Sequence, residues 1–146
     1  MEVQIEIKKT KAFAELEDGA YYKRFMSLLG DDVLKRWDKS SASENFWELG
    51  IHDMRDPKPL PDKLTQRTGR LVNSVKKKGA NEGIRFKSFS GDDMILTKGS
   101  TVEYANRQER QQGNRRSFLQ TSLIQVLSEM DNIKKNVLRK MREELK

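Results

Sequence analysis

The chain has 146 residues, of which 35% are hydrophobic and 35% are charged, and its formal net charge at pH 7 is +7. This length is that of one ordinary domain, and the charged fraction exceeds the roughly 25% of an average globular protein. Cysteine is absent, which excludes disulfides, thiolate zinc sites and a cysteine nucleophile.

The first seven residues predict a half-buried strand, because Val3, Ile5 and Ile7 alternate with polar side chains. No apolar run preceded by basic residues follows, so we expect no signal peptide. No stretch approaches the roughly 20 apolar residues that a membrane span needs. We therefore expect a soluble protein that is made in the cytoplasm.

Residues 12–37 predict helix, because their apolar side chains recur at spacings of three and four. Gly30 followed by Asp31 and Asp32 predicts an interruption, since glycine ends helices and acidic residues begin them. Two consecutive helices and one helix with a break both fit this pattern. Residues 39–43 read as a polar linker after it.

All the prolines of the chain fall close together, at Pro57, Pro59 and Pro61. Proline fixes φ and lacks a backbone donor, so residues 57–63 predict an extended connector. Within a single domain, 1–146, this connector separates a mainly helical part, 1–56, from a second part, 64–146.

The second part begins with a short helix and a β-hairpin. Thr68 is a candidate N-cap, and Lys76, Lys77 and Lys78 with Gly79 suit a helix C-terminus. The alternation in 84–89 and the apolar run 94–97 predict two strands joined by a four-residue turn.

Residues 118–145 predict one long C-terminal helix, because a continuous apolar stripe faces a side filled with lysine, arginine and glutamate. The fold class predicted is therefore α+β. It has N-terminal helices, a small antiparallel sheet with its hairpin at about 84–98, and this helix.

No catalytic constellation is visible in the sequence. His52 is the only histidine, and no nucleophile elbow accompanies it, so a hydrolase built around it has almost no support. The acidic pairs 31–32 and 92–93 lack the spacing of a calcium loop, and no phosphate-binding glycine motif occurs. We predict that the protein is not an enzyme and that it has no cofactor and no metal site.

Two short signatures stand out in the second part of the chain. They consist of Thr68-Gly69-Arg70-Leu71-Val72-Asn73-Ser74-Val75, and of Tyr104-Ala105 followed by Arg116 and Phe118-Leu119. These residues resemble segments of the phage virion-morphogenesis proteins, the tail-completion family that includes the G protein of phage Mu. In that family a "TGxLxxSI" segment is followed by a strand pair, a "YAxxHQxG" segment, a variable loop, and "ARxFL" leading into a C-terminal helix. The chain departs from it at 108–111, where the family usually has His-Gln-Phe-Gly, and at Ser117, where proline is common.

This resemblance implies a structural protein of the head–tail junction, a tail-completion or neck subunit that repeats around the tail axis as a homo-oligomer ring. Its partners would be its own copies and neighbouring neck, connector, tail-tube or tail-terminator proteins, with DNA contact in the lumen and no membrane. It would reside in the virion. Structural roles are implied for Thr68, Gly69, Leu71, Ser74, Tyr104, Ala105, Phe118 and Leu119.

We expect the ring contacts on three kinds of surface. These are the exposed edge of strand 84–89 or 94–98, the terminal segments, and the polar loop 106–116. The candidate interface residues in that loop are Arg107, Arg110, Arg115 and Arg116.

An uneven charge leaves one alternative open. Residues 1–62 hold 10 Lys+Arg against 13 Asp+Glu, a balance of −3, whereas 63–146 hold 19 against 9, a balance of +10. A basic half favours a nucleic-acid-binding protein that uses Lys76 to Lys78 and the loop arginines. A solvated basic face, or one that docks on an acidic protein, explains the same charge.

Overall fold

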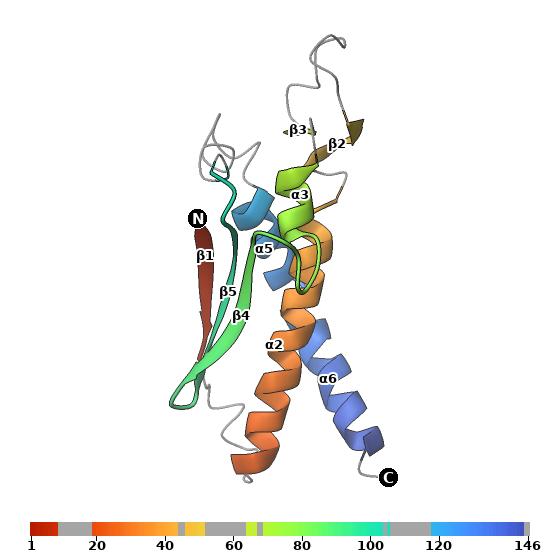
Figure 1. The fold of residues 1–146 in the computed structure, drawn as a ribbon. Helices are drawn as coiled ribbons and strands as arrows, with labels where there is room; N and C mark the ends of the chain where they lie inside the picture. Colours follow the sequence, from red (N-terminus) through yellow and green to blue (C-terminus); the bar gives the residue numbers. More distant parts are fainter. Residues whose placement is uncertain are drawn as a thin grey trace.

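The computed structural model describes residues 1–8, 19–43, 46–51, 64–66, 69–103, 105 and 118–144. A three-stranded antiparallel sheet packs one face against helices (Figure 1), so the α+β class is confirmed. The elements in chain order are β1 (Glu2–Ile7), α2 (Gly19–Ser41), β2 (Trp47–Ile51), β3 (Leu64–Gln66), α3 (Arg70–Val75), β4 (Gly83–Ser90), β5 (Asp93–Ser100), α5 (Phe118–Leu127) and α6 (Met130–Glu144).

The predicted first strand, β1, pairs antiparallel with β5, so that Ile5 lies opposite Leu96. The order of the sheet is β1-β5-β4, which makes β5 the central strand. The expectation that 94–98 could present an exposed edge is therefore wrong, because β1 and β4 occupy both of its sides. Within the described residues, the second sheet consists of β2 and β3, which run parallel.

The hairpin of β4 and β5 is tighter than predicted. Ser90 pairs with Asp93, so the turn consists of Gly91 and Asp92 and not of four residues. Gly91 has a φ of 62°, the left-handed conformation that a type II′ turn requires at this position and that glycine adopts without steric cost. The turn chemistry at 90–93 was identified, but its length was wrong.

Helix α2 continues through Gly30, so the predicted interruption is wrong. A Cβ at Gly30 would lie 2.7 Å from the Sδ of Met94, which shows that the glycine allows α2 to approach β5 closely. The predicted linker also begins too early, because the helix runs to Ser41. Asp31 thus lies inside a helix, where its Oδ1 is 2.8 Å from the Nζ of Lys87.

The predicted long C-terminal helix is two helices, α5 and α6, separated by a turn at Ser128 and Glu129. The Ser128 hydroxyl donates to the Gln125 carbonyl at 2.6 Å, which competes with continuation of the helix. The change of direction lets both helices turn apolar side chains towards α2. No helix among the described residues has the length and apolar character needed to cross a membrane.

The main core lies between the sheet and the helices. In it α2, including the fully buried Trp37, packs against Met94 and Leu96 of β5 and against the inward rows of α5 and α6. The Trp37 indole donates to the Leu119 carbonyl at 3.0 Å, which fixes α2 to α5. A second buried cluster lies at the end of the molecule where α3 and the start of α5 meet (Figure 1).

Candidate functional site

The second cluster collects residues of the resemblance that are far apart in the chain. Leu71 of α3, Ala105, and Phe118 and Leu119 of α5 are all buried in it. They pack with Trp47, whose ring meets the Phe118 ring edge-on at a centroid distance of 5.3 Å. Four motif residues thus form one scaffold, which includes the edge-on pair of aromatic rings.

Gly69 is the N-cap of α3 with a φ of 73° and makes no side-chain capping bond. The helix therefore begins at Arg70, and the expected N-cap at Thr68 is wrong. A left-handed residue at this point favours glycine, because it has no Cβ to clash with the backbone. Thr68 and Tyr104 lie outside the described residues.

Ser74 links α3 to the end of β5. Its buried hydroxyl donates to the Leu71 carbonyl at 2.6 Å and lies 2.7 Å from the hydroxyl oxygen of Ser100. Because Ser74 has one hydroxyl hydrogen, Ser100 is the donor of the second bond. The Ser100 oxygen in turn accepts from the Val102 amide at 3.2 Å. Through these hydrogen bonds Ser74 connects the backbone of α3 to the end of β5.

A buried charge cluster joins the sheet to α2. The Lys98 Nζ on β5 is 2.5 Å from Asp38 Oδ1, and the Arg85 Nε on β4 is 2.9 Å from Asp38 Oδ2. Lys98, only 1% exposed, also donates to the Val75 carbonyl at 2.7 Å. Its burial lowers the pKa of Lys98, while Asp38 opposes that shift. Sequence analysis missed this cluster, although Met94, Leu96 and Lys98 share one alternating row.

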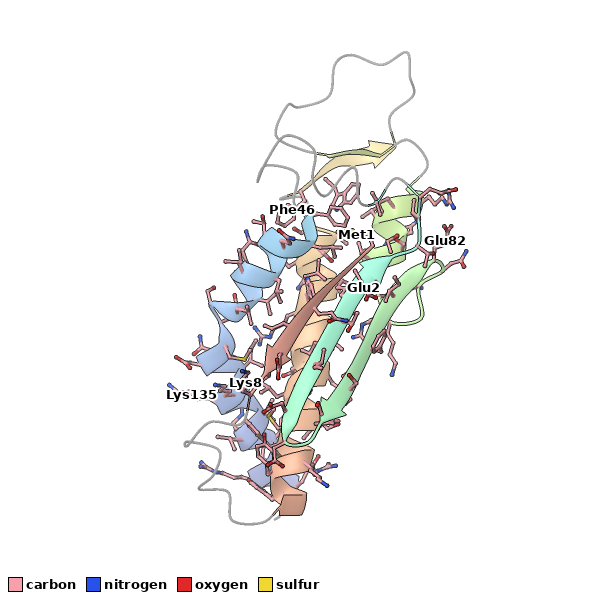
Figure 2. All side chains as sticks on the ribbon, turned by 90° about the vertical axis from the view of Figure 1, so that its left-hand side faces the viewer. Met1, Glu2, Lys8, Phe46, Glu82 and Lys135 are labelled. Atoms are coloured by element: carbon pink, nitrogen blue, oxygen red, sulfur yellow. The ribbon has the colours of Figure 1, made fainter. Side chains whose placement is uncertain are left out.

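Among the described residues, no helix lies on the opposite face of the sheet (Figure 2). Arg85 and Lys87 of β4 point to α2, since they bind Asp38 and Asp31 there. Alternate residues of a strand point to opposite faces, so Ile84 and Phe86 lie on the open face. Phe86 is 50% exposed, and within the described residues β4 is an edge strand of the sheet.

The structure describes some of the basic residues that the sequence suggests for contacts with anions, and not others. Lys76, Lys77 and Lys78 are exposed, and they line a hollow of about 800 Å³ beside α2. The arginines of the loop 106–116, namely Arg107, Arg110, Arg115 and Arg116, lie outside the described residues, as do His52 and the connector 57–63.

In the segments that the structure describes, no group of three or more histidine or acidic side chains is arranged to hold a metal ion. The predictions of no metal site and no catalysis remain predictions. Comparisons with protein-family models, with curated proteins and with solved structures find no match.

Proposed function

We propose that the chain is a structural subunit of the phage head–tail junction, a tail-completion or neck protein that repeats around the tail axis. In this role it helps to join the DNA-filled head to the tail. The observation that carries the proposal is the second cluster, in which Leu71, Ala105, Phe118 and Leu119 pack together. Residues with a shared scaffold role are what an assembly family would have in common.

The order of the elements also supports the proposal. The family pattern places a strand pair after the "TG" segment and ends in helix, and here α3 is followed by β4, β5, α5 and α6. This order alone is compatible with other functions, since a fold does not determine a function. It gains weight because Gly69 and Leu71 precede the strand pair and Phe118 and Leu119 begin α5, the order that the family pattern has.

Repetition around an axis requires two unlike surfaces on each subunit, because a heterologous interface joins different faces of neighbouring copies. The three-stranded sheet offers two edges, β1 and β4. An edge strand presents unpaired backbone groups that can pair with another strand. The exposed Phe86 adds apolar area beside the β4 edge. We place the contact with a neighbouring copy at this edge.

Replacing Phe86 by lysine should prevent self-association, because a charge on an edge strand opposes pairing with a neighbour. The matched control is Ile124→Lys on α5, where another exposed apolar side chain, 67% exposed, receives the same charge. Sedimentation velocity over a concentration series should show assembly for the wild type and the control, and only monomer for Phe86→Lys. Equal assembly of the two variants would place the contact elsewhere.

The role itself is tested in a phage whose genome encodes this chain. Negative-stain microscopy of lysates from a deletion of the gene should show full heads and finished tails lying unattached. A plasmid copy of the wild-type gene should restore joined particles. Intact infectious particles in the deletion lysate would contradict the head–tail role, whatever the purified chain does in solution.

A further inference from the structure

The exposed side of α2 carries a basic surface that neither the resemblance nor the motifs identify. Lys35 and Lys39 are exposed one helical turn apart, and both line two separate hollows. The hollow of about 800 Å³ reaches from them to the three lysines after α3 and to Arg85. The other, of about 820 Å³, reaches to α5 and α6.

Because the two lysines are shared, the hollows form one continuous surface across α2. We call it the basic band. Figure 1 shows the elements that contribute to it: α2, the segment that follows α3, β4, α5 and α6. The cations that line it are Lys35, Arg36, Lys39, Lys76, Lys77, Lys78, Arg85, Arg139 and Lys140.

The acidic residues of the basic band are already engaged by cations. Asp38 is held by Lys98 and Arg85, and Asp31 by Lys87. Glu129 and Asp32 pair with Arg36 and Lys140, at 2.8 Å and 3.9 Å. Of the cations that line the basic band, six are exposed and have no carboxylate partner among the described residues: Lys35, Lys39, Lys76, Lys77, Lys78 and Arg139.

The chemistry of the band distinguishes between its potential partners. Protein interfaces have an apolar, aromatic-rich core from which lysine is depleted. Among the described residues that line the hollows, only Ala42 and Val126 are apolar and none is aromatic. Proteins that bind single-stranded nucleic acid stack bases on aromatic rings, which are absent from this lining. Lysines without aromatics fit a phosphodiester backbone, which needs charge and no stacking.

We propose that the basic band binds the backbone of double-stranded nucleic acid without reading its sequence. Lys35 and Lys39 form the centre, because both hollows include them, and Lys76 to Lys78 and Arg139 extend the contact to the two sides. The proposal does not depend on the head–tail role. The sheet face with Phe86 and the basic band use different side chains, so both surfaces can be occupied together.

The test measures binding of the purified full chain to a fluorescent DNA duplex of about 20 base pairs over a series of salt concentrations. Lys35→Ala/Lys39→Ala should reduce the magnitude of the log–log salt slope by about 2 and weaken binding by about tenfold at about 50 mM salt. The matched control, Lys8→Ala/Lys23→Ala, removes the same charge from two exposed lysines that line neither hollow. It should bind nearly as the wild type does.

Equal losses in the two double variants would overturn the proposal, since net charge and not the band would then govern binding. Tighter binding of the matching single strand would overturn its duplex preference. If the chain bound poly-glutamate but not the duplex, the proposal would also be overturned, and an acidic protein would be the better partner. Unchanged circular dichroism and thermal midpoints would exclude unfolding as the cause of any loss, as expected for exposed side chains.

Discussion

Replacing Asp38 by alanine is expected to destabilise the protein by about 3–5 kcal/mol, the cost of removing one partner from a buried ion pair. Asp38 is the only carboxylate that binds both Lys98 and Arg85 in the described part of the chain. Without it, the nearly inaccessible ammonium of Lys98 has only the Val75 carbonyl as a hydrogen-bond acceptor among the described residues. Urea denaturation followed by circular dichroism measures the loss.

The matched variant is Lys98→Met, which removes the other partner. Asp38 then keeps Arg85, and the methionine fills most of the space without the cost of burying a charge. We expect less than half of the loss caused by Asp38→Ala. A greater loss in Lys98→Met would show that the lysine contributes chiefly through its bond to Val75.

The Asp38→Ala variant should also acquire a pH dependence of its own. Asp38 raises the pKa of Lys98 against the lowering effect of burial, so its removal lowers that pKa further. Between the lowered folded value and the unfolded value near 10.5, the unfolded state binds more protons, and stability therefore rises with pH. The variant should recover part of its stability as the pH rises through this window. A loss that stays constant up to pH 10 would contradict this origin.

Gly99→Ala is expected to destabilise the protein by about 3 kcal/mol, at the upper end of the cost of overpacking. A Cβ at Gly99 would lie 2.1 Å from the Met1 carbonyl oxygen and 2.7 Å from the Glu2 Cα. Both atoms belong to the backbone of β1 and its preceding residue, which cannot move without separating β1 from β5. Urea midpoints and m-values measure the effect.

The control for this prediction is Gly30→Ala in α2. There the added Cβ would lie 2.7 Å from the Met94 Sδ, near the end of a flexible side chain. Alanine in place of glycine inside a helix also contributes up to about 1 kcal/mol of stability. The two effects oppose each other, so we expect a net change within about 1 kcal/mol. If Gly99→Ala lost no more stability than the small change expected for Gly30→Ala, β1 would shift more easily than its contacts indicate.

Local patterns predicted the elements better than their ends. Alternation identified β1 and β4, because the period of the side chains reports which face of a strand is buried, and an apolar run identified β5. Glycine and acidic residues at 30–32 predicted a break that does not exist. The sequence shows the low helix propensity of Gly30 but not Met94, whose close approach across the core favours glycine there.

The candidate site was predictable in part. Leu71, Ala105, Phe118 and Leu119 were chosen from a resemblance, and the structure brings them into one cluster. The positive charge of residues 63–146 indicated Lys76, Lys77 and Lys78 as candidates. The basic band also includes Lys35 and Lys39, which belong to the N-terminal part with a negative charge balance. A sum over a stretch of sequence does not indicate which side chains share a surface.

The α+β class, the first strand, the hairpin and the helical C-terminal part could all be predicted from the sequence, because each depends on a pattern among neighbouring residues. The tertiary structure decided which strand is central, that Phe86 is exposed and Lys98 is buried, and which lysines lie together. Lys98 illustrates the physical reason. A lysine in a sequence predicts a solvent-exposed side chain, and only an aspartate 60 positions away makes its burial tolerable.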